Sequence, residues 1–413
     1  MKEAKAELLL NKVKSNYILK RIFGNVTRTK FFNVIRYNKR IQKKLEKDLE
    51  DYRKEHLKIE LEIVPGGNNF AYFISYIKDT NESCYHIYIN DNKEELKRNY
   101  YIKNDKAKKI KVVLEFPLNT SLSGLFKNCN DIKKITFNKF NRKDINNMSH
   151  MFSECESLEE IVFNHFKTDN VTNMESMFNK CCSLKKLDLS NFNTNNLQNM
   201  NNMFNKCEKI EKINFSNFNT DKVIDMKNSF SYCSSLKELD ITNFKTNNVK
   251  DMSMIFLGCE SIKELNISNF HTDNVIDMKY MFAECSSLEK INMVNFNTNN
   301  VIYMNFMFSQ CKSLKEINFS NFKTSNLVHI DGMFNKCSSL QKLDLSSFNT
   351  DKVTNMRKMF NGCSSLKELD LSNFNSKNTN DLANMFNGCN SLTKFICSDK
   401  EIQDMEANKK DYF

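Results

Sequence analysis

The 413-residue sequence has no tryptophan, only two prolines and no run of eighteen apolar residues. The missing apolar run excludes a membrane-spanning helix of ordinary length. The nucleotide-binding pattern G-x-x-x-x-G-K, the hydrolase pattern G-x-S-x-G and the zinc-protease pattern H-E-x-x-H are absent. No two cysteines have the Cys-x-x-Cys spacing of common zinc sites. We therefore expect no enzyme, no cofactor, no metal and no small-molecule substrate.

The first residues also lack the features of a signal peptide. The segment MKEAKAELLLNKVKSNY has only Leu8, Leu9 and Leu10 as an apolar run, and no cysteine precedes Cys84 that could carry a lipid anchor. We expect a cytoplasmic protein. The chain is rich in Asn, Lys, Phe and Ile, which is typical of an AT-rich genome, so no function is inferred from asparagine content alone.

Cysteine, in contrast, is present in a strict pattern. Eleven cysteines follow one another at intervals of 26 residues without an insertion: Cys129, Cys155, Cys181, Cys207, Cys233, Cys259, Cys285, Cys311, Cys337, Cys363 and Cys389. An unbroken period of this length indicates one structural unit stacked on copies of itself, because an insertion would disturb the register of the stack. About two thirds of the chain is therefore predicted to be a solenoid, an architecture more typical of binding scaffolds than of enzymes.

Each unit begins with a pattern typical of a short strand. A Leu or Ile lies three residues after the cysteine, and two apolar residues then alternate with polar ones, as in Leu187 and Leu189. This period of two predicts a strand with one buried face. A phenylalanine follows in each unit, and we expect these rings to stack between repeats, with Phe270 buried between Phe244 and Phe296.

The second half of each unit changes to a period typical of a helix. In the unit after Cys155, the apolar residues are spaced three, three, one and three apart: Val171, Met174, Met177, Phe178 and Cys181. This spacing predicts one face of a short helix, with Thr168 or Asp169 as its N-cap. The expected unit is thus a strand, a turn and a short helix, with neighbouring strands paired in parallel.

The full repeat resembles a known family. The order Leu-x-x-Leu-x-Leu-x-x-Phe is similar to the leucine-rich repeat, and the longer pattern looks like the BspA-type repeats of bacterial surface proteins, mycoplasma lipoproteins and protist proteins. The clearest matches are Met281, Phe282, Cys285, Leu288, Phe296 and Thr298, and then Met359, Phe360, Cys363, Leu366, Leu369, Leu371, Asn373 and Phe374. Over residues 119–397 the resemblance implies an α/β fold, a right-handed leucine-rich-repeat solenoid with a parallel sheet and short helices. It also implies a general recognition role without catalytic residues.

Three regions are expected along the chain. Residues 1–56 form a basic helical segment, with sixteen Lys and Arg against seven Asp and Glu, which accounts for +9 of the formal net charge of +11. Residues 57–118 alternate as strands at 57–64, 69–77, 84–89 and 110–116, and form a small β module that shields the open edge of the solenoid. Residues 119–413 form the solenoid of about eleven repeats with a C-terminal cap.

The basic segment suggests two further hypotheses. Residues 15–45 are similar to an F-box, a helical motif that docks substrate receptors onto ubiquitin ligases, although Ser15 and Asn16 stand where the usual Leu-Pro opening would be. The positive charge also suggests nucleic acid or an anionic membrane as a partner. Acidic residues interleave with the lysines, however, so a solvated basic face is the favoured interpretation, and nucleic acid is not favoured as a partner.

The repeat also predicts the state of the cysteines and a candidate binding face. Stacked cysteines with parallel side chains suit buried, reduced thiols better than disulfides. On the outward face of the strands, Lys and Glu mix at the fifth position after each cysteine, where opposite charges on neighbouring strands are mildly stabilising. The seventh position supplies the candidate partner-binding residues: Asp188, Asn214, Asp240, Asn266, Asn292, Asn318, Asp344 and Asp370.

Three functions remain open from the sequence. The leading hypothesis is a non-enzymatic scaffold that binds proteins through the strand face, where the acidic residues would select a basic partner. The second is a substrate receptor of a ubiquitin ligase, docked through residues 15–45. The third is a surface adhesin of the BspA type, against which the missing signal peptide argues.

Overall fold

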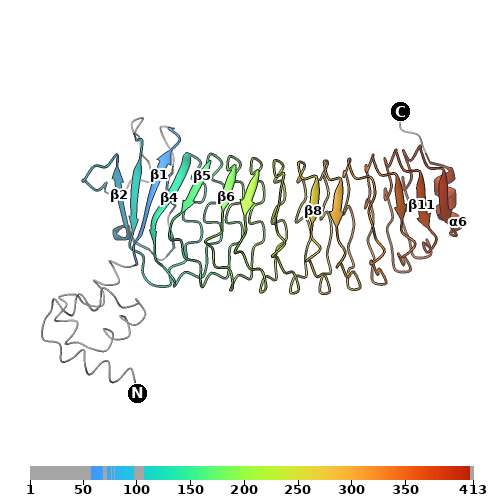
Figure 1. The fold of residues 1–413 in the computed structure, drawn as a ribbon, viewed down its shortest axis with the longest axis horizontal. Coiled ribbons are helices and arrows are strands. Elements are labelled where there is room, and N and C mark those ends of the chain that lie inside the picture. The colour runs from blue at the N-terminus through green and yellow to red at the C-terminus, as the bar shows by residue number, and fades with distance from the viewer. Residues whose placement is uncertain (1–56, 68–71, 76, 79, 97–106, 410–413) are drawn as a thin grey trace, which may run out of the picture.

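The computed structural model describes residues 57–67, 72–75, 77–78, 80–96 and 107–409 (Figure 1). Over this part the chain is a mostly β solenoid, in which one coil stacks on the next from the N-terminal β module to the C-terminal end. Parallel bridges at 26-residue intervals connect ten equivalent residues from Asn147 to Asp381, which confirms the predicted repeat. The basic segment 1–56, including the F-box-like residues 15–45, lies outside the described residues.

One side of the solenoid carries the short strands predicted after each cysteine, and we call it the strand layer. Its strands are β4 (Ile132–Phe140), β5 (Glu160–Phe163), β6 (Lys186–Asp188), β7 (Lys212–Asn214), β8 (Glu264–Asn266), β9 (Lys290–Asn292), β10 (Lys342–Asp344), β11 (Glu368–Leu371) and β12 (Lys394–Cys397). Equivalent residues pair in parallel, and the central residue of each three-residue strand points inward. The layer is interrupted, because residues 238–240 and 316–318 occupy the same position of the repeat without forming a strand.

The predicted short helices are wrong. The second half of each repeat is a series of tight turns, which we call the turn layer and which corresponds to residues 173–181 in one repeat. Here Met177 N–H donates to Met174 O and Cys181 N–H donates to Phe178 O, at 3.2 and 3.1 Å. The third residue of each turn, Ser176 or Lys180, has a positive φ, as in a type II turn.

Alternate backbone N–H groups of the turn layer bond to the next repeat. Met174 N–H donates to Asn199 O and Phe178 N–H donates to Met203 O, both at 2.9 Å. A helix would direct these groups to residues four positions away. Two turns in succession bring buried side chains to one side every three or four residues, which is also the spacing of a helix face. The apolar pattern is therefore the same for both structures. Thr168, the predicted N-cap, bonds instead to Asn193 of the next repeat.

A stack of phenylalanine rings runs through the core from end to end, but not in the predicted column. The continuous stack contains the phenylalanine three residues before each cysteine, from Phe126 to Phe386, with ring centroids 5.2–5.9 Å apart. Phe270 is buried as expected, with 1% of its surface exposed. Its predicted stack between Phe244 and Phe296 is wrong: among the described ring pairs this column stacks only at 140–192, 218–244 and 296–374.

The two layers pack face to face through these rings. Phe152 of the turn layer meets Phe163 of β5 at 6.2 Å, and Phe308 meets Phe319 at 5.9 Å, with the rings near perpendicular in the second pair. Edge-to-face contacts of this kind are favourable beyond the burial of apolar area. The core is thus a single column of interlocked side chains along the whole solenoid.

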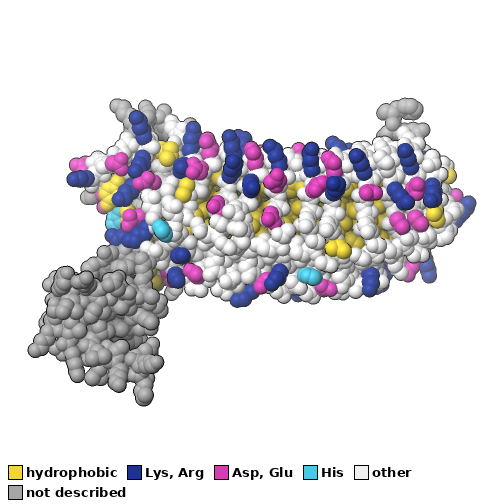
Figure 2. Space-filling view, in the orientation of Figure 1, with side chains coloured by type: hydrophobic (Ala, Val, Ile, Leu, Met, Phe, Trp, Pro, Cys, Tyr) yellow, Lys and Arg dark blue, Asp and Glu magenta, His cyan; other side chains and the backbone are white. Residues whose placement is uncertain are grey.

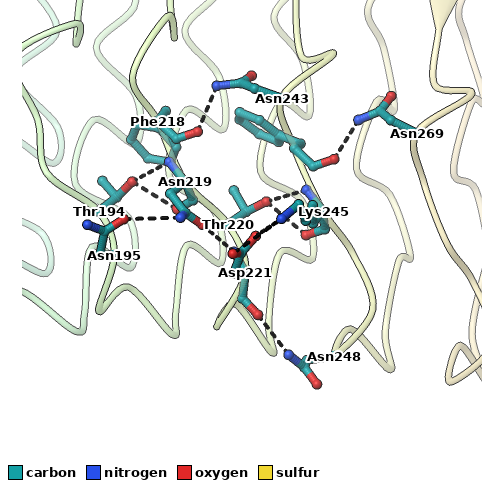
Figure 3. Close-up of polar contacts among 11 residues, drawn as sticks. Thr194, Asn195, Phe218, Asn219, Thr220, Asp221, Asn243, Lys245, Asn248 and Asn269 are labelled. Atoms are coloured by element: carbon teal, nitrogen blue, oxygen red, sulfur yellow. Dashed lines mark hydrogen bonds and ion pairs between the residues drawn. The ribbon is translucent and has the colours of Figure 1, made fainter.

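Buried threonines at equivalent positions also connect the repeats, and we call them the threonine ladder. Each hydroxyl, from Thr168 to Thr350, donates to a carbonyl and accepts an N–H from the residue 25 positions later, at 2.6–3.1 Å. Figure 3 shows two steps of this ladder, Thr194 with Asn219 and Thr220 with Lys245. The bonds satisfy backbone groups that would otherwise be buried without partners.

Both ends of the stack are covered. At the N-terminal end, β1 (Ile59–Pro65) pairs antiparallel with β4 and with β3 (Ile110–Leu114), and β2 (Tyr85–Ile89) extends the sheet after a single 3-10 turn at Glu82–Cys84. Residues 73–74, which lie within the predicted strand 69–77, are bends instead. At the other end, helix α6 (Lys400–Ala407) buries Ile402 against the last coil.

A side chain that binds a carboxylate replaces threonine at each end of the threonine ladder. Arg142 stands at the first position, fully buried, where it binds the carboxylate of Asp144 and donates to Phe116 O and Pro117 O at 3.0 and 2.7 Å. At the last position Ser376 donates to the carboxylate of Asp399, at 3.0 Å. At both ends of the ladder, charged side chains thus take part in hydrogen bonds that a neighbouring repeat provides elsewhere.

Candidate partner-binding surface

The structure gives the eight predicted partner-binding residues a shared local role. Each lies on the outer side of the strand layer, and its side-chain oxygen accepts the N–H of the residue two positions later, at 2.8–3.3 Å. Such Asx turns end the strands and turn the chain inward. Asp188 and Asn214 make the same bond, so the turn requires the oxygen and not the charge.

Sequence reasoning missed this role, although a signal was present. In seven of the eight repeats a Ser or Thr follows the Asx residue by two positions, as in Asp240-Ile-Thr242 and Asp344-Leu-Ser346. In these two repeats the hydroxyl also donates to the carboxylate, at 2.7 and 2.6 Å. These hydrogen bonds lower the pKa of Asp240 and Asp344, so both carboxylates are charged at neutral pH. The two carboxylates therefore hold their turns and also present negative charge at the surface.

Lys and Glu residues at the fifth position after a cysteine form ion pairs between neighbouring strands, as predicted. Lys290 lies 2.8 Å from Glu264, Lys134 lies 2.8 Å from Glu160, and Glu368 lies 3.5 Å from the lysine on either side. Exposed pairs of this kind contribute little to stability, because solvent screens the charges. Their alternation leaves little net charge along most of the upper surface, where lysine and acidic side chains are interspersed (Figure 2).

A depression of about 680 Å³ lies on the strand layer beside the interruption at 316–318. It is lined by residues of β8, of β9 and of segment 316–318, and Ile291 and Ile317 in its floor are only half-buried. Glu264, Glu289 and Glu316 line it with a single lysine, Lys290, which is paired with Glu264. The result is an apolar floor with an excess of negative charge in a protein whose net charge is positive.

The depression could not be predicted from the repeat. Isoleucine or leucine stands at the central strand position in nearly every repeat, and Leu265 is buried at the same position where Ile291 is not. The difference arises from the local loss of strand pairing at 316–318, which the repeat pattern does not signal. Three of the eight candidate residues line the depression, namely Asn266, Asn292 and Asn318, and the four aspartates lie outside it.

The cysteines form a buried ladder of thiols. All fourteen are free and twelve are buried, in agreement with the sequence argument. From Cys155 to Cys389, each ladder thiol donates to the carbonyl of the phenylalanine in the preceding repeat, at 2.9–3.2 Å. Burial raises the pKa of Cys285 and Cys337 to about 12. These thiols therefore stay protonated and unreactive at neutral pH.

Two features are absent from the described part of the chain. There, no three His, Cys, Asp or Glu side chains come together as a metal-binding group. Among the same residues, no helix has the length and apolar character needed to cross a bilayer.

Comparisons with known proteins identify a family. The family model described as "Mycoplasma protein of unknown function, DUF285" matches residues 120–239, 225–318 and 311–410, which together are more than half of the chain. No curated protein sequence matches.

Solved structures give weaker similarities. A leucine-rich repeat protein from Bacteroides ovatus is 20% identical, with a TM-score of 0.46, over 71% of this chain and 66% of its own, slightly under two thirds. A leucine-rich cell surface protein from Faecalibacterium prausnitzii is 17% identical, with a TM-score of 0.31, over 70% and 79%. TLR13 in a complex with ssRNA13 is 14% identical, with a TM-score of 0.28, over 64% and 40%. With TM-scores below 0.5, these structures say nothing about what this chain binds.

Proposed function

The chain belongs to the DUF285 family, and we propose that it is a non-enzymatic scaffold that binds protein partners through the strand layer. The depression beside β9 carries this proposal, because it is a concave surface with an apolar floor in a layer whose outward side chains are mostly polar. Solenoids commonly present such extended faces to partners. A half-buried apolar floor with polar edges is also the composition of a protein-binding site.

The charge of the depression defines the partner. Three carboxylates and one ammonium group line it, and Lys290 is already paired with Glu264, so Glu289 and Glu316 remain to attract positive charge. We therefore expect a partner segment with apolar side chains for the floor and lysine or arginine at its edges. Opposite charge would raise the association rate and make binding sensitive to salt.

Affinity capture with a depression variant tests the proposal. We expect Glu289→Lys/Glu316→Lys to lose at least one protein that the wild type captures from cell extract, measured by quantitative mass spectrometry. The matched control is Glu159→Lys/Glu160→Lys, which reverses two glutamates on or beside β5 at the same two positions of the repeat. The proposal fails if the two variants capture the same set of proteins as the wild type.

A second variant separates the predicted aspartate column from the depression. Asp188, Asp240, Asp344 and Asp370 are all changed to Asn, which removes four charges and keeps the oxygen that accepts each Asx-turn bond, as Asn214 already does. A loss of partner with unchanged unfolding would assign the recognition of positive charge to the column. Unchanged capture would restrict the recognition of positive charge to the depression.

Capture with a chain that lacks residues 1–56 tests the ligase hypothesis, since a Skp-like adaptor should then be lost.

A further inference from the structure

Three consecutive repeats of the turn layer carry apolar and aromatic residues at outward positions where other repeats are mostly polar. We call these residues the aromatic patch: Ile276, Tyr280, Ile302, Tyr303, Phe306 and Val328. Ile276 is exposed, and the other five are half-buried. In other repeats the position of Ile302 holds Thr172, Gln198 or Lys250, and the position of Phe306 holds Ser176 or Asn202.

The patch departs from the repeat at a cost to the fold. Tyr280 and Phe306 have φ values of 53° and 57°, a conformation that is unfavourable for bulky side chains. Tyr303 and His329 stand where Asp277 accepts the N–H of Lys279, and neither can make that Asx-turn bond. Since smaller or polar residues satisfy the turn in other repeats, the aromatic side chains are not required for stacking. Unfavourable conformations of this kind are a reason to look for function.

The rings are held in fixed positions. Tyr280 stacks on Phe306 with centroids 4.9 Å apart, and Tyr303 stacks on His329 at 5.2 Å. The far side of Phe306 lies against Gly332, where a Cβ atom would collide with the ring. Lys279 Nζ lies 5.1 Å from the centroid of Tyr303. Pre-ordered aromatic side chains are typical of the central contacts of protein interfaces.

A groove of about 560 Å³ includes three members of the patch. Ile276, Ile302 and Val328 provide its apolar lining, together with asparagines at the same position of three repeats: Asn274, Asn300 and Asn326. The side-chain amides of the asparagines donate to backbone carbonyls at 2.7–2.8 Å, which holds them in place. Among the described residues, the only charged ones that line the groove are Lys250 and Lys352, from the repeats that flank the apolar three.

We propose that this groove and the aromatic patch bind an extended protein segment that has an apolar centre and carboxylates at its ends. The apolar side chains would contact Ile276, Ile302 and Val328, and the carboxylates would pair with Lys250 and Lys352. Nucleic acid is a poorer fit, because bases need free ring faces for stacking. Here the rings cover one another in pairs, and Lys279 and Gly332 cover two of the remaining faces.

This site is distinct from the strand-layer depression in both place and charge. The depression has an excess of carboxylates, whereas the groove has only lysines. A scaffold with two faces of opposite preference can hold two different partners at once. Either proposal can fail without the other, because the variants that test them share no residue.

A peptide selection on the full chain tests the proposal. The probe is a phage-displayed library of random peptides of about twelve residues, long enough to cross the groove when extended. The library is selected on the wild type and counter-selected on Ile302→Glu. We expect enrichment of peptides with an apolar centre and Asp or Glu on both sides. Enrichment of basic-flanked peptides, or of none that distinguish the two proteins, would overturn the proposal.

Fluorescence anisotropy with the most enriched peptide then assigns the contacts. We expect Lys250→Glu/Lys352→Glu to weaken binding about tenfold or more, with the effect reduced at high salt. Phe306→Ser should weaken binding while the fold is retained, because Ser176 occupies the equivalent position. The matched control is Ile224→Glu, at the same position of the repeat as Ile302 but outside the patch and 57% exposed. Equal binding by Phe306→Ser and wild type, or equal losses in Ile224→Glu and Ile302→Glu, would contradict the assigned site.

Discussion

The turn layer and the strand layer are built from the same repeats but differ in continuity. In the turn layer, nine bridges follow one another from Asn147 to Asp381, and the phenylalanine stack beside them is unbroken. In the strand layer the pairing stops between β5 and β6 and again at residues 238–240 and 316–318, and three-residue strands remain between these breaks. The layer predicted to be the sheet is therefore the less continuous one.

This difference gives the two layers different parts in holding the stack together. The turn layer holds the repeat distance, because its backbone, its thiols and its phenylalanine rings all contact a neighbouring coil. The strand layer can then lose pairing locally without loss of the stack, and the depression lies at such a place. The comparison predicts that changes of buried residues in the turn layer affect stability strongly, whereas changes of outward-facing residues in either layer affect binding.

The largest difference is expected in thiol reactivity. Cys285 lies in the buried ladder, and Cys397 is half-buried at the end of β12. We expect iodoacetamide to modify Cys285 about a thousandfold more slowly than Cys397 at pH 8, because Cys285 must first be exposed by unfolding. Mass spectrometry of the labelled peptides measures both rates. Similar rates, or a disulfide between ladder cysteines as the main species, would contradict the buried ladder.

The phenylalanine columns should differ in stability. Phe282→Ala removes a ring that stacks on Phe256 and Phe308, at 5.7 and 5.2 Å. Phe270→Ala removes a buried ring without such neighbours. Both variants create a cavity and should lower the free energy of unfolding by about 3–5 kcal/mol. The loss should be larger for Phe282→Ala, by about 1 kcal/mol, because this ring also loses its stacking partners. Urea unfolding measures the difference, and a larger loss for Phe270→Ala would reverse the assignment of the two columns.

The end of the threonine ladder should depend on a buried ion pair. Removal of Arg142 leaves Asp144 without its partner, so Arg142→Met should lower the free energy of unfolding by about 3 kcal/mol. Burial acts to raise the pKa of Asp144, but the hydrogen bonds and the charge of Arg142 outweigh it, and the net pKa is lowered. This contribution is complete above the unfolded-state pKa of about 4 and is lost as the pH falls through the lower folded-state value.

Urea unfolding at several pH values tests the ion pair. The wild type should lose stability below about pH 4, and Asp144→Asn should show a smaller loss over the same range. The double variant Arg142→Met/Asp144→Asn should recover part of the stability that Arg142→Met loses. Equal pH dependence in wild type and Asp144→Asn would show that the pair contributes nothing to the stability of this end.

The smallest difference in stability is expected between the loss of a buried and the loss of an exposed hydrogen-bonding side chain. Thr272 is buried and both donates to and accepts from Asn297, at 2.8 Å. Thr272→Val keeps the shape, leaves both backbone groups without partners and should cost about 2 kcal/mol. Asn266→Ala removes an exposed Asx-turn bond to Ser268 and should cost less than about 1 kcal/mol. Thermal unfolding of the two variants measures both costs, and equal shifts would remove the distinction between the buried and the exposed hydrogen bonds.

Most of the repeat was predictable from the sequence, but the conformation of its second half and the depression were not. The cysteine period predicted the register that the parallel bridges from Asn147 to Asp381 confirm, and the alternation at Leu187 and Leu189 predicted a strand correctly. The apolar spacing around Met174 and Phe178 predicted a helix wrongly, because paired tight turns produce the same spacing. The Asx turns at Asp188 and its equivalents had a signal, the Ser or Thr two positions later, whereas the depression had none.

The sequence by itself determined the repeat, the free thiols and which side chains face inward, because each of these follows from the spacing of residues along one chain. The tertiary structure decided which layer is continuous, where the strands separate and which residues form the groove beside Ile302. These features depend on whether backbone groups find partners in the preceding repeat or the next. A pattern that is nearly identical in every repeat carries no information about that choice.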